Sequence, residues 1–390
     1  MPDTSPVFVR DEMVPASPAP ASNSGVVGWM RKNLFATPAD TVLTIIGAAF
    51  VLWIVPNLYN FLIGHAVWTG DDGDACRIQG VGACWTYVWH RMDFFIYGFF
   101  PPDARWAGQA GILNEILAQW RVNLVFAIGL ILIVPLMIPS VPFKAFNALL
   151  FFVVFPIIVY VMLNGGMFGL SEVPTEQWGG LTVTLIIGLV GIVTSLPFGI
   201  VLALGRQSRL PVIRMLCVAY IELWRAVPLI TVLFMASIML PLFMPEGVNV
   251  DKLLRALVGV ALFNSAYMAE VVRGGLQALP KGQYEAASAL GLNYWKSMMF
   301  IILPQALKHV IPGIVNTFIA LFKDTSLVSI IGIFDLLKTV QSANADANWA
   351  APTQAMTGYI FAAMVFWIFC FSMSRYSIFM EQRLHTGHKR

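Results

Sequence analysis

Charged residues are scarce in this chain. Of its 390 residues only 12% are Asp, Glu, Lys or Arg, whereas a soluble domain has about 25%. The apolar share is 58%, against about 45–50% in soluble domains, and the mean hydropathy is +0.74. These values exclude a soluble globular protein. A net charge of +3 also provides no basic surface for a nucleic acid.

Motifs for nucleotide binding and hydrolysis are missing as well. The sequence has no G-x-x-x-x-G-K-[ST] phosphate loop, so the chain cannot bind ATP by that means. HExxH and GxSxG are absent, which disfavours an enzyme embedded in a membrane. Asp71, Asp72 and Asp74 lack the downstream bidentate Glu of a calcium loop. We therefore expect no catalytic residue, no metal site and no cofactor on this chain.

Cysteines number only 4, and they are of two kinds. Cys217 and Cys370 lie in apolar surroundings and are interpreted as inert core thiols. Cys76 and Cys84 flank the segment CRIQGVGAC, in which two glycines let the chain double back. If this loop lies in an oxidising compartment, a disulfide is predicted, and the alternative is two free cysteines.

Long apolar runs dominate what remains. A membrane-spanning helix needs about 20 apolar residues. Uncharged runs that satisfy or nearly satisfy this requirement cover residues 42–63, 122–141, 146–163, 179–205, 226–245 and 347–374. Two further apolar segments, 253–272 and 303–334, are interrupted by charges. The sequence therefore predicts an all-α integral membrane protein with about eight transmembrane helices.

Composition divides the chain into three parts. Residues 1–38 are rich in Pro, Ala and Ser (VPASPAPASNSG) and are predicted to form a disordered cytoplasmic arm. The first apolar run begins too late and is too long for a cleavable signal, so it is interpreted as an anchor. Residues 39–165 are predicted to form an N-terminal extension of three helices with an aromatic external loop. Residues 175–385 are predicted to form a block of five helices.

One segment of that block has a recognisable spacing. Residues 281–310 read KGQYEAASALGLNYWKSMMFIILPQALKHV, and within them the pattern E-A-A-x3-G-x9-I-x-L-P is complete. Its positions are Glu285, Ala286, Ala287, Gly291, Ile301, Leu303 and Pro304. The pattern, over 281–304, resembles the cytoplasmic coupling loop in the membrane subunits of ATP-binding-cassette (ABC) importers. The alternative is an ordinary amphipathic surface turn.

The same segment can be interpreted residue by residue. Pro280 favours a helix that starts just after it, and Gly291 supplies the left-handed residue that ends a helix. Asn293 can cap the next helix. Ala286, Ala287 and Ala289 leave a surface narrow enough to enter a groove, and Glu285 is the exposed anion for a partner. The sequence predicts a short helix parallel to the membrane.

Further phrases in residues 175–385 resemble the permease subunits of polar amino acid ABC importers. They are GLTVTL (180–185), YIELWRAVPLI (220–230), FNSAYMAEVVRGGL (263–276) and KDTSL (323–327). FFIYGFFPPDARW (94–106) and the extension are similar to the larger, M-type permease of general L-amino acid importers. The resemblance implies a type I permease core and the partners of such a system. These are a homologous permease subunit, a dimer of ABC ATPases carrying ATP and Mg²⁺, and a periplasmic amino-acid-binding protein.

With the coupling loop inside, the basic residues favour both termini in the cytoplasm of a bacterial inner-membrane protein. The cytoplasmic set is Arg31, Lys32, Lys144, Arg206, Arg209, Arg214, Arg273, Lys281, Arg383, Lys389 and Arg390. Four arginines disagree, because they fall in the loop assigned outside among several aspartates: Arg77, Arg91, Arg105 and Arg121.

Opposite charges interrupt the apolar segments in three pairs, which are Lys323 with Asp324, Glu270 with Arg273, and Glu222 with Arg225. An unpaired charge at the bilayer centre costs at least about 2.5–3.5 kcal/mol. A zwitterionic amino acid needs a cation and an anion, so these pairs are candidates for the substrate path, with Asn264, Ser265 and Tyr267 as neutral contacts. The alternatives are self-neutralising structural pairs and polar contacts between helices.

The sequence thus predicts a membrane-spanning permease subunit of an ATP-driven importer of polar L-amino acids, with ATP hydrolysis on a separate chain. Alternatives are an ABC permease for another small polar solute, an ion-coupled secondary transporter, for which no inverted repeat is visible, and a non-transporting scaffold.

Overall fold

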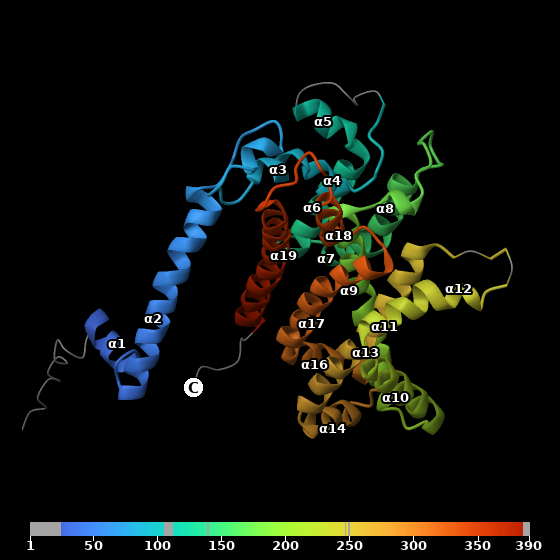
Figure 1. Ribbon diagram of the computed structural model, residues 1–390. Helices are drawn as coiled ribbons and strands as arrows, with labels where there is room; N and C mark the ends of the chain where they lie inside the picture. Colours follow the sequence, from blue (N-terminus) through green and yellow to red (C-terminus); the bar gives the residue numbers. More distant parts are fainter. Residues whose placement is uncertain (1–24, 105–111, 139, 246, 249, 385–390) are drawn as a thin grey trace, which may run out of the picture. The chain divides into compact units, whose positions relative to one another are not determined.

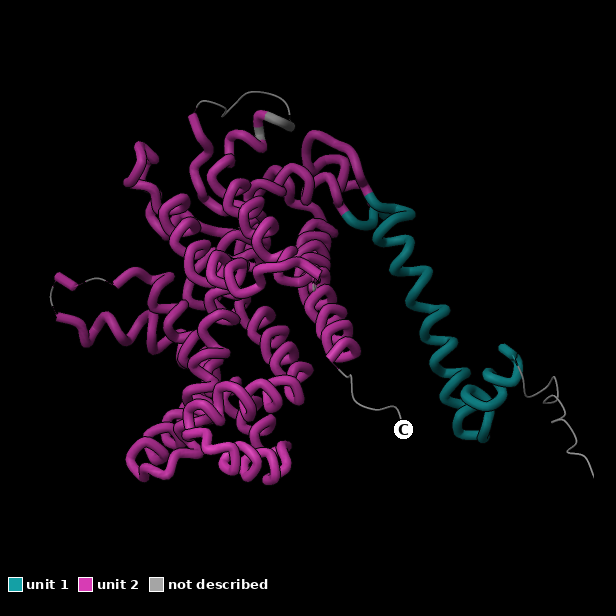
Figure 2. Tube along the Cα trace, turned by 180° about the vertical axis from the view of Figure 1, so that it is seen from behind, with its two compact units in different colours: residues 1–66, 80–83 teal, residues 67–79, 84–390 magenta. Residues whose placement is uncertain are grey.

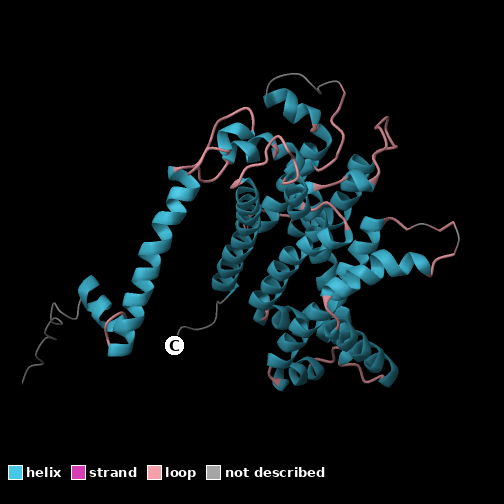
Figure 3. Ribbon diagram, in the orientation of Figure 1, coloured by secondary structure: helices cyan, strands magenta, loops and turns pink. Residues whose placement is uncertain are grey.

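The computed structural model describes residues 25–104, 112–138, 140–245, 247–248 and 250–384. Within these ranges the protein is helical, with isolated bridges but no named strand (Figure 3). The prediction of an all-α fold is confirmed. The α-helices, labelled in Figure 1 where there is room, are α1 Gly25–Asn33, α2 Pro38–Tyr59, α3 Trp85–His90, α4 Met92–Tyr97, α5 Ile112–Ala118, α6 Trp120–Met137, α7 Lys144–Leu149, α8 Phe155–Asn164, α9 Gly180–Arg206, α10 Pro211–Ala226, α11 Leu229–Phe234, α12 Leu240–Leu242, α13 Lys252–Ala278, α14 Lys281–Ala289, α15 Tyr294–Ser297, α16 Leu303–His309, α17 Ile311–Asp324, α18 Leu336–Ala343 and α19 Gln354–Leu384.

Seven helical stretches of the described residues are long and apolar enough to cross a membrane. An eighth is added if α10 and the helical stretch from α11 to α12 count as one span. Five of the predicted spans agree with the observed helices to within a few residues: Pro38–Gly64, Trp120–Met137, Lys144–Asn164, Gly180–Arg206 and Lys252–Ala278.

Three predicted spans differ from the structure, and proline accounts for each difference. The run 226–245 forms the shorter helical stretch Leu229–Leu242, because Pro228 lies just before it and separates it from α10 with a bend of 101°. The run 303–334 is broken at Val310, ahead of Pro312, so the span begins at Ile311. The run 347–374 begins too early, because a loop with Pro352 precedes α19.

The first compact unit comprises residues 1–66 and 80–83, of which the part from residue 25 is described (Figure 2). In α2 the capping box of Thr37 and Asp40 satisfies amides of the first turn, and no residue of this helix is buried. The predicted disordered arm 1–38 falls largely outside the described residues. The prediction is wrong for the last part of this arm, because Gly25–Asn33 forms α1. The sequence of α1, GVVGWMRKN, contains no proline.

The second unit comprises residues 67–79 and 84–390. In its N-terminal part, α6 packs against α8, and the buried Arg121 of α6 forms hydrogen bonds to the end of α8. The Arg121 guanidinium donates to the carbonyl oxygens of Met162 at 2.6 Å and Leu163 at 3.2 Å. It also donates to Ser171 O at 3.0 Å. Arg121, which the sequence analysis places in the external loop, therefore lies in α6 and connects it to the end of α8.

At the centre of this unit α9 packs along α13 (Figure 1). Small residues allow the approach, because a Cβ added at Gly199 would lie 2.7 Å from Met268 Cβ and 3.0 Å from Ala269 N. Buried apolar side chains of α9, α13, α16 and α17 extend this contact toward α14. The α9–α13 pair is therefore the scaffold on which the remaining core helices are arranged.

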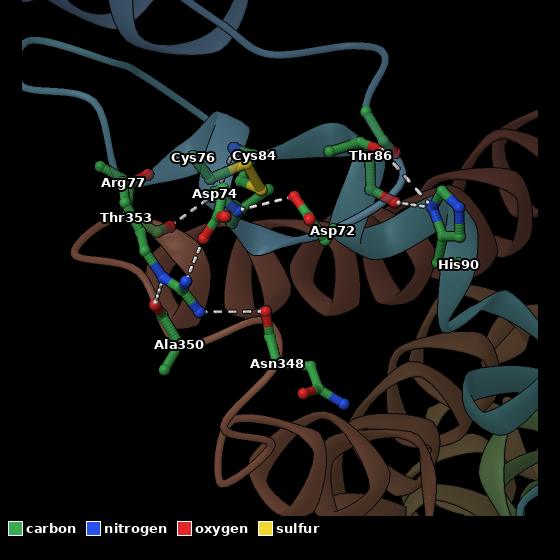
Figure 4. The surroundings of a disulfide bond; sticks show 12 residues. Asp72, Asp74, Cys76, Arg77, Cys84, Thr86, His90, Asn348, Ala350 and Thr353 are labelled. Atoms are coloured by element: carbon green, nitrogen blue, oxygen red, sulfur yellow. Dashed lines mark hydrogen bonds and ion pairs between the residues drawn. A yellow bond between two sulfur atoms is a disulfide. The ribbon is translucent and has the colours of Figure 1, made fainter.

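A disulfide between Cys76 and Cys84, with Cα atoms 5.7 Å apart, closes the loop before α3 (Figure 4). Arg77 follows Cys76 and donates to the carbonyl oxygens of Ala350 at 3.0 Å and Asn348 at 3.2 Å. Beneath this loop Tyr87, Phe95 and Trp349 share one apolar cluster with residues of α18 and α19. The disulfide-closed loop is thus packed onto the core helices.

Candidate functional site

The coupling segment forms a short helix, α14, with well-defined ends. Pro280 lies immediately before its first residue, and Gly291 has φ +71°, as the sequence predicts. The amide of Gly291 donates to Ser288 O at 3.0 Å and that of Leu292 to Ala287 O at 3.3 Å. Asn293 then caps α15 by accepting the Lys296 amide at 3.0 Å. The chain therefore leaves α14 in a sharp, hydrogen-bonded turn.

Contacts from one face hold α14 against the bundle. Gln283 Oε1 accepts from Gln305 Nε2 at 3.1 Å, and the Tyr284 hydroxyl donates to Leu276 O at 3.2 Å. Burial raises the pKa of Tyr284, so its hydroxyl remains a donor at neutral pH. Ala287 is only 1% exposed, and Tyr284 packs against the apolar cluster that includes Leu276 of α13 and Ala306 of α16.

The opposite face of α14 is open. Glu285, Ala286, Ala289 and Gly291 are exposed, and Leu290 at its end is 74% exposed. One part of the prediction needs correction: Ala287 does not contribute to a surface that could enter a groove, because it anchors the helix from the inner face. The exposed residues of α14 carry one carboxylate, on Glu285, and one amine, on Lys281, and the others are small.

A network of ionic contacts connects the ends of α9, α10 and α13. Arg206 Nη1 lies 2.7 Å from Glu270 Oε1 and 3.1 Å from Glu222 Oε1. Arg273 Nη2 lies 2.8 Å from Glu270 Oε2, and Arg225 Nη1 is 3.8 Å from the same oxygen. Glu270 thus receives three guanidinium groups from three helices. The network connects these helices and is more than a set of local pairs.

The predicted pairs have different outcomes. Glu270 and Arg273 do pair on one face of α13. Glu222 and Arg225 do not pair with each other, because Glu222 meets Arg206 and Arg225 lies over the Tyr267 ring at 5.9 Å. The sequence analysis does not identify Arg206 as a member of this network, because it places Arg206 only among the basic residues that indicate the cytoplasmic side. Its position at the end of a long apolar helix was a signal, but its partners are 16 and 64 residues away.

Lys323 and Asp324 end α17 near the middle of the Ile311–Ile331 span. Lys323 is exposed, Asp324 is half-buried, and within the described part of the chain no ion pair or side-chain hydrogen bond joins either to a neighbour. The alternative of a mutually neutralising ion pair is therefore not supported by a contact.

The neutral candidates lie on α13. Asn264 is buried and donates to Val260 O of its own helix at 2.9 Å, whereas Tyr267 is exposed enough to contact Arg225. Ser265 lies 2.9 Å from the Tyr220 hydroxyl, which connects α13 to α10. Of these side chains, Asn264 and Ser265 make structural contacts and Tyr267 belongs to the ionic network.

Comparisons with known proteins identify the family of this helical chain. Residues 195–386 match the family described as "Binding-protein-dependent transport system inner membrane component". The chain is 52% identical over 374 residues to the inner membrane amino-acid ABC transporter permease protein YhdY of Escherichia coli, covering 96% of this chain and 97% of that protein.

Two other relatives show how the resemblance is distributed. The glutamate/glutamine/aspartate/asparagine transport system permease protein BztC of Rhodobacter capsulatus is 40% identical and matched over the full length of both chains. The probable glutamine permease GlnP of Bacillus subtilis is 33% identical, and 88% of it aligns with only 50% of this chain. The chain belongs to the family of binding-protein-dependent inner-membrane transport components, the permease subunits of ABC transporters.

Proposed function

We propose that this chain is a membrane-spanning subunit of an ATP-driven importer of polar L-amino acids. The observation that carries the proposal is α14, which is anchored through Ala287 and leaves Glu285 free for a partner. The names of the full-length relatives support amino acids as the substrate class. The bound partners would be a related permease chain, two ATPase subunits holding ATP and Mg²⁺, and a periplasmic amino-acid-binding protein.

In this proposal α14 and both termini face the cytoplasm. Closure of the ATPases on ATP would move α14 together with α13 and α16, because Tyr284 connects it to α13 and Gln283 connects it to α16. The helix bundle would then change from inward-facing to outward-facing, and the substrate would pass between the two permease chains. Lys323 is proposed as the contact for the carboxylate of the substrate, and Asp324 as the contact for its ammonium group.

The test is a charge reversal at the exposed face of α14. Glu285→Lys should abolish ATP-dependent uptake and co-purification of the ATPase while the chain remains in the membrane, because reversal repels a basic or donor-rich groove. Glu172→Lys reverses an exposed carboxylate in the loop before the core and should leave both readouts unchanged. Normal uptake and normal co-purification with Glu285→Lys would contradict the assignment of α14.

The rival functions have their own measurements. A panel of amino acids and other small polar solutes, assayed for uptake in the reconstituted complex, separates an amino acid permease from one for another solute. An ion-coupled secondary transporter would retain uptake after the ATPase is removed, whereas the proposed importer would lose it.

A further inference from the structure

A pocket of about 540 Å³ lies beside the ionic network, between the C-terminal ends of α9 and α13 and the first half of α10. Its lining is basic and amide-bearing: Arg206, Gln207, Arg214, Val218, Arg273 and Gln277. Carboxylates are absent from this lining, although Glu222 and Glu270 lie next to it in contact with Arg206.

The pocket is built by a close hairpin of α9 and α10. A Cβ at Gly205 would lie 2.3 Å from Cys217 Sγ, so only glycine permits this approach. The connecting turn is closed by the Leu210 amide, which donates to Ser208 Oγ at 3.1 Å. Arg206 and Arg214, one from each helix of this hairpin, line the pocket together with Arg273 of α13.

Positive charge in the pocket exceeds the negative charge around it. Four arginines (206, 214, 225 and 273) lie in or beside the pocket, and only Glu222 and Glu270 oppose them. Arg214 has no ion-pair partner among the described residues. Two positive charges are therefore left without a counter-charge from this part of the chain.

Guanidinium and amide groups together form a carboxylate-binding set. Arginine presents parallel N–H groups that match the two oxygens of a carboxylate, and glutamine adds further donors. Gln277 is already oriented, because its Oε1 accepts from Arg273 Nη1 at 2.6 Å, which leaves its NH₂ group available to a ligand. The excess of two positive charges favours a solute with two carboxylates over one with a single carboxylate.

We propose that this pocket binds a small dicarboxylate, such as an acidic amino acid, from the side on which α14 lies. The assignment of that side to the cytoplasm rests on the proposed function, but the binding site itself does not. The ligand would join α9, α10 and α13 through Arg206, Arg214 and Arg273. This site is separate from Lys323 and Asp324, which do not line it.

The test is binding of L-glutamate to the purified full-length chain, without ATPase, in lipid nanodiscs by titration calorimetry. Arg214→Gln should weaken the dissociation constant for L-glutamate at least tenfold, because this guanidinium has no other described partner. Arg209→Gln changes an arginine of the same turn that does not line the pocket, and it should bind like the wild type.

Each result of these titrations decides the proposal. Absence of L-glutamate binding, unchanged binding in Arg214→Gln, or an equal loss in Arg209→Gln would overturn it. Inorganic phosphate is the second probe, and displacement of L-glutamate by phosphate at equal concentration would overturn the carboxylate assignment. If Arg214→Gln does not fold, Arg214→Lys keeps the charge without the fork, and unchanged affinity in that variant would overturn the proposal. The binding measurement contains no ATPase, so it does not depend on the coupling role of Glu285. If Glu285→Lys left transport unchanged, the proposed function would fail but the measured L-glutamate binding would still support the pocket.

Discussion

At the scale of single residues, the charged side chains within the spans differ in the contacts that they make. An ionisable group in a span is costly unless protein or water surrounds it. Glu270 meets this requirement with three arginines, whereas no ion pair or side-chain hydrogen bond joins Lys323 or Asp324 to a described side chain. These two residues are therefore the stronger candidates for contacts with a substrate or with another chain.

Lys323→Ala and Asp324→Ala should each raise the substrate concentration for half-maximal uptake about tenfold or more. A hydrogen bond to a charged group contributes about 1.5–3 kcal/mol, which corresponds to this factor. Uptake kinetics of both single variants and the double variant in the reconstituted complex provide the measurement. Wild-type kinetics in the double variant would instead show that the two charges only neutralise each other.

At the scale of elements, close helix contacts and helix caps determine how the core holds together. Gly199→Ala should destabilise the protein by about 1–3 kcal/mol, because the new Cβ overlaps Met268 and the backbone of Ala269 on α13. Gly274→Ala is the matched control, since nothing lies within 4 Å of its added Cβ. Thermal unfolding in detergent should separate the two variants, and equal midpoints would argue against tight α9–α13 packing.

The cap of α18 is predicted to make local stability depend on pH. Asp335 is fully buried and accepts the amides of Leu337 at 3.2 Å and Lys338 at 3.0 Å. Burial raises the pKa of Asp335 from 3.8 to about 6, although these hydrogen bonds oppose the rise. The folded state therefore holds the proton more tightly than the unfolded state, and stability falls as pH rises from about 4 to about 6.

The loss approaches about 3 kcal/mol, since each pKa unit is worth about 1.4 kcal/mol. Hydrogen exchange of the α18 amides, corrected for intrinsic rates, should show less protection at pH 7 than at pH 5. Asp335→Asn keeps an acceptor for the helix amides but does not titrate, so its protection should be the same at both values. An equal pH dependence in the variant and the wild type would exclude Asp335 as its origin.

At the scale of the whole molecule, the proposed topology can be tested with introduced cysteines. Cys84 is fully buried, so labelling it directly would report on access and not on side. Ile78→Cys and Leu290→Cys replace residues that are 66% and 74% exposed, in a background without Cys217 and Cys370. A membrane-impermeant thiol reagent should label Ile78→Cys in intact spheroplasts, and Leu290→Cys only after permeabilisation. The reverse pattern would invert the proposed orientation.

The sequence by itself determined the class of the protein and the local form of its coupling segment. The length of an apolar run predicts a spanning helix, because a backbone within a membrane must form its hydrogen bonds internally. Pro280, Gly291 and Asn293 determine where helices begin and end through their own and neighbouring backbone groups. Both kinds of information are local, so a sequence can carry them. The same locality explains why α14 is placed correctly while the bend at Pro228 is not, since a bend depends on what the second segment packs against.

Only the tertiary structure decided which charged groups meet and which face of α14 is free. Glu222 prefers Arg206, 16 residues away, to Arg225, because α9 and α10 come together at Gly205. Ala287 is buried and Glu285 exposed because one side of α14, which Tyr284 and Gln283 connect to α13 and α16, faces the helix bundle. Contacts between distant segments depend on the packing of whole helices, which no local spacing specifies.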